Sequence, residues 1–166
     1  MSFSHVRLNH AVRFVSDLEP AAGFYTEVLG MEEIAREPRA NAAFLRLPSS
    51  GIHHDLGLFG LGPSAAPRQR GAVGPYHLDW QLDTVDELVE AGAYTGESSR
   101  GATKSLYGAD PDGNEFEIMW MLPREEWGAY EHAATVERLD LDAEGERFSG
   151  VRAGWPSLEA DGRPQA

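Results

Sequence analysis

The stretch LNHAVRFVSDLEPAAGFYTEVLG, residues 8–30, decides the fold. Its first part mixes β-branched and aromatic residues at a spacing that predicts a strand over residues 6–15. Asp17 then has the short polar side chain of a helix N-cap, Pro20 suits the first helical turn, and Gly30 is a typical helix end. The apolar residues at helical spacing between them are Leu18, Ala21, Ala22, Tyr25, Val28 and Leu29.

Short strands follow the helix, and then the whole pattern begins again. The first set is predicted near residues 31–37, 42–47 and 54–59, with breaks at Pro38 and at the turn over 48–51. Residues 61–75 are Gly, Pro, Ala, Ser and Arg with little periodicity, which indicates an exposed connector. The second copy is predicted as a strand over 76–82, the N-cap Thr84, a helix with Val85, Leu88 and Val89 that ends at Gly92, and strands near Tyr94, 103–107 and 115–120.

The two copies are in register. When His10 is placed over His77, Asp17 falls over Thr84 and Leu18 over Val85, so strand, cap and helix coincide. We therefore predict an α+β fold of two βαβββ modules in one chain, with sheets that form a half-open barrel around one cavity. The predicted domain spans 1–122, with module one at 5–60, the connector at 61–75 and module two at 76–122, followed by a partly ordered tail over 123–166.

Composition narrows the classes of partner and site. The 166 residues carry 14 Lys and Arg against 27 Asp and Glu, and the formal charge of −13 disfavours nucleic acid and acidic membranes as partners. The chain has no cysteine, so any metal must be bound by nitrogen and oxygen ligands. The first residues lack the apolar segment of a signal peptide, and no apolar run is long enough to span a bilayer, so the expected location is the cytoplasm.

Three residues form a candidate metal site. His10 and His77 occupy equivalent places in the two modules, and Glu117 lies in the last predicted strand between Phe116 and Ile118, where a carboxylate needs a partner. Two imidazoles and one carboxylate make the facial triad of non-haem Fe(II) oxygenases, and Mn(II) suits similar ligands. The simpler alternative is two hydrogen-bonded strand histidines and a glutamate paired with an arginine.

The segments LNHAVRFVSDLEPAAGFYTEVLGME, HHDLGLFG, YHLDW and YGADPDGNEFEIMW resemble the vicinal oxygen chelate superfamily. They are most similar to its extradiol ring-cleaving dioxygenases, over roughly residues 5–122. The resemblance implies Fe(II)-dependent cleavage of a catecholic ring by dioxygen, with His10, His77 and Glu117 as metal ligands.

The resemblance also implies roles for two further residues. His54 corresponds to the acid–base histidine and Tyr107 to a tyrosine that hydrogen-bonds the substrate oxygen, whereas a surface histidine and a core tyrosine are the plainer alternatives. The chain departs from the two-domain extradiol enzymes near Ser98, where those enzymes have another histidine.

The sequence leaves two alternative functions open and also predicts an assembly. Glyoxalase- and epimerase-type isomerases usually add a fourth ligand, commonly a glutamate, from the last strand of module one, but HHDLGLFG offers Asp55 and no Glu. A binding protein for a small drug or antibiotic has no need of the three metal ligands. Trp127, Tyr130 and Trp155 give the tail apolar anchors, so we predict a homodimer.

Overall fold

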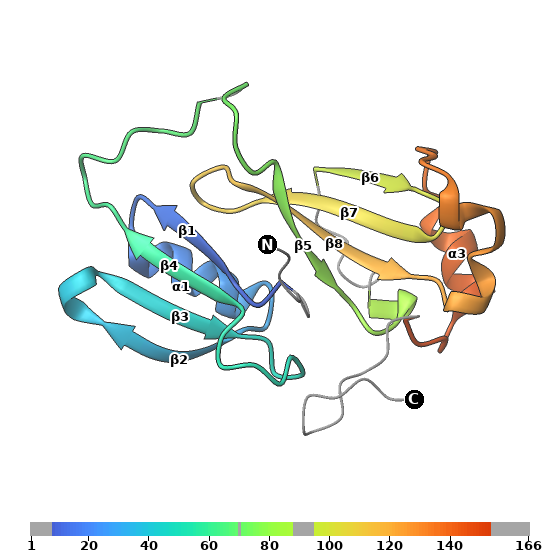
Figure 1. Cartoon of the computed structure of the whole chain (residues 1–166), viewed down its shortest axis with the longest axis horizontal. Helices are drawn as coiled ribbons and strands as arrows, with labels where there is room; N and C mark the ends of the chain where they lie inside the picture. Colours follow the sequence, from blue (N-terminus) through green and yellow to red (C-terminus); the bar gives the residue numbers. More distant parts are fainter. Residues whose placement is uncertain (1–7, 70, 88–94, 154–166) are drawn as a thin grey trace, which may run out of the picture. The chain divides into compact units, whose positions relative to one another are not determined.

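The computed structural model describes residues 8–69, 71–87 and 95–153 (Figure 1). The chain divides into two compact units, with the division after residue 69. Each unit contains one four-stranded sheet, and neither sheet closes on itself. The predicted α+β class is confirmed.

The first unit is a βαβββ module. Its elements are β1 (Ala11–Val15), α1 (Leu18–Glu27), β2 (Glu32–Glu37), β3 (Ala42–Arg46) and β4 (Leu56–Gly60), with a short 3₁₀ helix over Pro38–Ala40. The strand order is β1-β4-β3-β2. β1 and β4 are parallel, whereas β4, β3 and β2 are antiparallel neighbours.

Helix α1 begins and ends where its capping residues require. The Asp17 carboxylate accepts a hydrogen bond of 3.2 Å from the Glu19 N–H, and Gly30 has a positive φ of 64° after the last turn. The buried side of the helix contacts β3 and β4 and consists of Leu18, Ala21, Ala22 and Tyr25. Val28 was wrongly predicted on this side: it follows the last helical residue and is 59% exposed, because the helical face ends before it.

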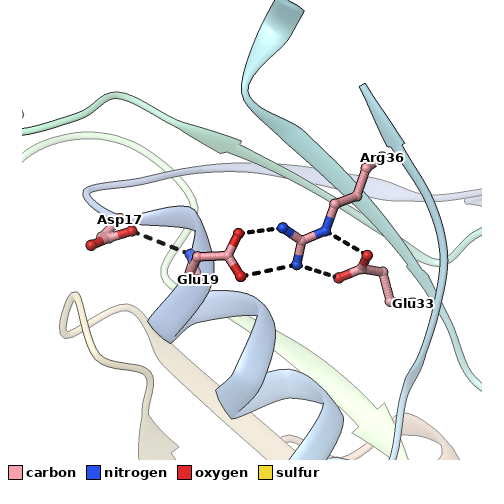
Figure 2. Close-up of polar contacts among 4 residues, drawn as sticks. All are labelled: Asp17, Glu19, Glu33 and Arg36. Carbon is pink, nitrogen blue, oxygen red and sulfur yellow. Dashed lines mark hydrogen bonds and ion pairs between the residues drawn. The ribbon is translucent and has the colours of Figure 1, made fainter. Parts of the chain in front are cut away.

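An arginine joins the start of α1 to the outer strand of the sheet. Figure 2 shows Arg36 of β2 between Glu19 of α1 and Glu33 of its own strand, with hydrogen bonds to both carboxylates. β2 is an edge strand of this sheet, and charged side chains on an edge strand disfavour its pairing with a strand of another molecule. The same contacts lower the pKa of Glu19 and raise that of Arg36.

The second unit repeats the first. Its strands are β5 (His77–Gln81), β6 (Gly96–Ser99), β7 (Thr103–Ala109) and β8 (Glu115–Met121), in the order β5-β8-β7-β6. β5 and β8 are parallel, as β1 and β4 are. The strand order and the parallel pair confirm the predicted repeat of βαβββ modules.

The helix that follows β5 starts at a reciprocal cap. The Thr84 hydroxyl accepts from the Glu87 N–H at 3.3 Å, and the Glu87 carboxylate accepts from the Thr84 N–H at 2.9 Å. Val85 is the first helical residue and is fully buried. The sequence predictions for Val6, Leu88, Val89, Gly92, Tyr94 and Trp155 lie outside the described residues.

Three predicted strands begin later than the sequence indicated. β1 begins at Ala11, so residues 8–10 of the strand predicted over 6–15, including His10, precede it. β4 begins at Leu56 and leaves His54 outside it. Just before the strand, the Asp55 carboxylate accepts the Leu47 N–H at 2.8 Å. β6 begins at Gly96, whereas the strand was predicted near Tyr94, which itself lies outside the described residues.

The C-terminal segment is part of the second unit's core. It contains 3₁₀ helices over Arg124–Glu126 and Gly128–His132, and α3 (Leu141–Phe148). Buried side chains from the sheet and this segment form one cluster: Val85, Leu106, Trp120, Leu122, Leu139 and Phe148. Trp127 packs against the cluster, and its indole N–H donates to the Leu122 carbonyl at 2.7 Å. No helix within the described ranges is both long and apolar enough to cross a membrane.

Candidate metal centre

His77 and Glu117 lie side by side on the parallel strands β5 and β8. Their closest atoms, His77 Nε2 and Glu117 Oε2, are 2.9 Å apart. Glu117 is 5% exposed, so its carboxylate is largely withdrawn from water. A buried carboxylate is costly without a partner, and here the partner is a histidine, where the simpler sequence alternative expected an arginine.

The donor set and spacing of this pair fit a divalent metal. Two ligands bound about 2.1 Å from a metal in neighbouring octahedral positions are roughly 3 Å apart, close to the observed separation of 2.9 Å. His77 also has a buried Nδ1 with no hydrogen-bond partner among the described atoms. No group of three His, Asp or Glu side chains arranged to hold a metal occurs in the described residues, so the pair needs a third ligand.

Asp79 adds a second carboxylate beside Glu117. The two residues are partners in the β5–β8 register, so their side chains lie on the same side of the sheet. Although part of Asp79 is open to solvent, desolvation of its carboxyl and then the charge of Glu117 raise its pKa to about 7. A bound cation would favour its charged form. The sequence analysis missed Asp79, which the period of two from His77 could have indicated.

Tyr107 lies next to the pair and is held by two side chains. It is the β7 partner of Glu117, and its ring centroid is 6.0 Å from that of His77. Its hydroxyl shares a 2.9 Å hydrogen bond with the buried Ser98 hydroxyl and accepts a longer one of 3.5 Å from Arg100. Ser98 therefore contacts Tyr107 at the place where the resemblance noted a missing histidine. Arg100 was not predicted, since nothing in the local pattern marks its reach to Tyr107.

The first unit gathers three histidines near the starts of β1 and β4. The ring centroids of His10 and His54 are 4.5 Å apart, and the Nδ1 atoms of His53 and His54 are 3.0 Å apart. The Phe44 ring meets the His54 ring edge-on at 5.2 Å. Desolvation, followed by the nearby His10 and His53, lowers the pKa of His54. His54 is thus half-buried among aromatic rings, while His53 is exposed.

The repeat allows each candidate ligand to be compared with the residue at the equivalent position of the other unit. His10 corresponds to His77, and the β1–β4 register pairs Val12 with Gly57 as the β5–β8 register pairs Asp79 with Glu117. Gly57 therefore occupies the place of Glu117 in the first unit. A ligand that the isomerases would need from this strand is absent at the equivalent position.

Comparison with known proteins places the chain in a family. Residues 7–118 match the model of the Glyoxalase/Bleomycin resistance protein/Dioxygenase superfamily. The chain belongs to this superfamily. A superfamily member described as glyoxalase/dioxygenase, from Nostoc punctiforme, has the same fold with a TM-score of 0.58 at 20% identity, over 73% of this chain and 99% of that one. A lactoylglutathione lyase from Agrobacterium tumefaciens aligns with a TM-score of 0.52 at 22% identity, over 70% of this chain and 94% of that one.

Curated relatives in the superfamily are dioxygenases by name. Biphenyl-2,3-diol 1,2-dioxygenase 3 of Rhodococcus globerulus is 28% identical over 96% of this chain and 90% of that protein. Catechol-2,3-dioxygenase of Bacillus subtilis is 30% identical over 57% of this chain. This match spans 35% of the catechol enzyme, and the match to biphenyl-2,3-diol 1,2-dioxygenase 2 of Rhodococcus globerulus spans 39% of that protein.

Proposed function

We propose that the chain is an Fe(II)-dependent extradiol dioxygenase that cleaves a catecholic ring with dioxygen, its metal held by His10, His77 and Glu117. The observation that carries the proposal is the contact between His77 and the buried Glu117, whose closest atoms are 2.9 Å apart. The dioxygenase names of the curated relatives support it. The proposal requires the His10 imidazole of the first unit to complete the ligand set.

The metal, when bound, would hold the two vicinal oxygens of the substrate and dioxygen together. The chain's own residues would orient the ring and move protons. His54 would accept a proton from a catechol hydroxyl and return one later. Tyr107 would hydrogen-bond a substrate oxygen, because Ser98 fixes the position of its hydroxyl.

The isomerase alternative is less well supported. An isomerase of this superfamily would need a fourth protein ligand, and Gly57 stands at the position equivalent to Glu117. The carboxylate of Asp55, which the sequence offers instead, accepts the Leu47 N–H at 2.8 Å. These two observations favour a centre with three protein ligands and open positions for substrate and dioxygen.

The test combines metal binding with oxygen consumption. The full chain is loaded anaerobically with Fe(II), and a parallel sample with Mn(II). The metal content per chain is measured, and a catechol is then added in air-saturated buffer. We expect one metal per chain and one dioxygen consumed for each catechol. Glu117→Gln should lose the metal, whereas the matched control Glu115→Gln, on the same strand and the same side, should keep it.

Each competing function gives a different result. Tight binding of a catechol without oxygen uptake would indicate a binding protein. Conversion of a substrate without oxygen, by the metal-loaded chain, would indicate an isomerase. Equal metal content in the two glutamate variants would refute the assignment of Glu117 as a ligand.

A further inference from the structure

One side of the first sheet carries aromatic and aliphatic side chains where the equivalent side of the second sheet carries the polar residues of the candidate centre. The β1, β3 and β4 registers pair Val12 and Phe44 with Gly57, and Phe14 with Phe59. Cross-strand partners share a side of the sheet, so these residues lie together. We call this surface the aromatic face: Val12, Phe14, Phe44 and Phe59.

The aromatic face is a connected surface that reaches the histidines. The Phe14 and Phe59 rings meet edge-on at 6.4 Å, and the Phe44 and Phe59 rings at 6.2 Å. Phe44 also contacts His54 at 5.2 Å, and His54 lies 4.5 Å from His10. A molecule held by the imidazoles would therefore find an apolar surface next to them within the same unit.

This surface is open, although apolar residues of the same sheet are buried on the other side. Phe14 is 67% and Val12 52% exposed, whereas Leu56 and Leu58 are fully buried against α1. Gly57 adds to the opening, because a Cβ atom there would reach Val12 at 3.5 Å and Phe44 at 3.6 Å. Exposed aromatic clusters of this kind are typical of binding surfaces.

Two charged side chains described next to the aromatic face, Arg46 and Asp55, are already engaged. Arg46 forms an ion pair with Glu32 at 3.1 Å, and the Asp55 carboxylate accepts the Leu47 N–H. A carboxylate placed on the apolar rings would lose water without gaining a partner, which is unfavourable. The formal charge of −13 also repels anions.

We propose that the aromatic face binds an uncharged apolar substituent of the substrate ring, so that the chain selects alkyl- or aryl-substituted catechols over carboxylated ones. The choice of a catechol as the ligand rests on the proposed function, whereas the preference for an apolar substituent can be measured by binding alone. Phe14 is then a specificity-determining residue, since it is the most exposed ring of the face.

The test uses ligand pairs of nearly equal shape that differ in charge. Dissociation constants are measured anaerobically, on the full metal-loaded chain, for 3-isopropylcatechol against 2,3-dihydroxybenzoate and for 4-isopropylcatechol against 3,4-dihydroxybenzoate. We expect the isopropyl member of at least one pair to bind roughly tenfold more tightly than the carboxylate. This is the difference in binding that a small apolar group in a pocket typically contributes. Tighter or equal binding of both carboxylates would overturn the proposal.

Variants locate the preference on the face. Phe14→Ala should weaken the favoured isopropyl ligand by roughly tenfold and leave unsubstituted catechol unchanged. Gly57→Val, which fills the opening between Val12 and Phe44, should weaken the same ligand. The matched control Val28→Ala removes another exposed apolar side chain of the unit and should change neither ligand. Equal losses for the isopropyl ligand and catechol in Phe14→Ala would contradict the proposal.

Two outcomes distinguish this inference from the proposed dioxygenase activity and from a contact between copies of the chain. Selective binding of the isopropyl ligand without oxygen uptake would support the aromatic face while removing the dioxygenase. If Phe14→Ala changes the mass of the protein in solution and leaves both ligand pairs unaffected, the face is a contact between copies of the chain and the proposal is wrong.

Discussion

Lys104 holds the C-terminal helix to the second sheet through a nearly buried ion pair. Its ammonium nitrogen is 2.8 Å from Glu144 Oε1 of α3 and 3.0 Å from the Ser99 hydroxyl. The side chains of Lys104 and Glu144 are 7% and 18% exposed, and Glu144 Oε2 has no hydrogen-bond partner among the described atoms. Lys104→Met keeps a long side chain but leaves the Glu144 carboxylate unpaired.

The expected loss of stability is large for a single substitution. Removing one partner of a buried pair costs about 3–5 kcal/mol, and the remaining exposure of Glu144 favours the lower end, about 3 kcal/mol. For a chain of this size, each kcal/mol lowers the melting temperature by about 2–4 °C, so we expect a fall of about 6–12 °C. Lys104→Met with Glu144→Met should recover most of it, because apolar residues can replace a buried pair at little cost.

Denaturant unfolding of the wild-type chain, Lys104→Met, Glu144→Met and the double variant gives the required cycle. Glu144→Gln should lose less than Lys104→Met, since the amide oxygen can still accept from the ammonium and Ser99 remains a partner. A loss below about 1 kcal/mol for Lys104→Met, or a double variant no more stable than that single one, would refute this account of the pair.

Four further predictions follow from other contacts. His54→Gln should keep the metal and lower turnover roughly a hundredfold, because acid–base catalysis is worth about 10²–10⁴ in rate; full activity in the metal-loaded variant would remove His54 from the mechanism. Gly108→Ala should destabilise the chain by about 1–3 kcal/mol in denaturant unfolding, because its Cβ would lie 2.4 Å from the buried Phe116 ring; unchanged stability would mean that the ring moves freely. The lowered pKa of Glu19 adds stability that is present above its unfolded pKa and is lost as the pH falls through the folded value. Arg36→Gln should abolish this pH dependence and return the NMR titration of Glu19 to its ordinary range. An unshifted titration in the wild-type chain would contradict the contact. Light scattering at micromolar concentration should give the mass of a homodimer, and a monomeric mass would count against the predicted assembly.

Local signals were enough for the elements and for the repeat. Asp17 and Gly30 bound α1 as predicted, and the offset between His10 and His77 is reproduced by two sheets of the same strand order. Capping and glycine chemistry act over a few residues, so a sequence shows them directly. The pairing of His77 with Glu117 needed the repeat as well, since it brings together strands that are far apart in the chain.

Contacts that depend on the register between strands could not be predicted from the sequence. Ser98 was noted for the histidine it lacks, but its bond to Tyr107 depends on how β6 pairs with β7. His54 was expected in a strand, but β4 begins at Leu56, after a local contact in which the Asp55 carboxylate accepts the Leu47 N–H. Trp127 was expected to anchor a dimer, yet it packs in the second unit's own core, where its indole bonds to a backbone carbonyl.

The two units differ at the positions around the candidate metal pair. His10 and His77 are equivalent and both remain histidine, but Glu117 corresponds to Gly57, Asp79 to Val12, and Tyr107 to Phe44, since Phe44 and Tyr107 are the partners of Gly57 and Glu117. Each of these changes exchanges a polar group in the second unit for an apolar one in the first. Under the proposed function, the second unit would supply charge for the cation and the first an apolar surface for the ring. A catechol would use both, because its two oxygens can bind a metal and the transfer of its apolar ring out of water is favourable.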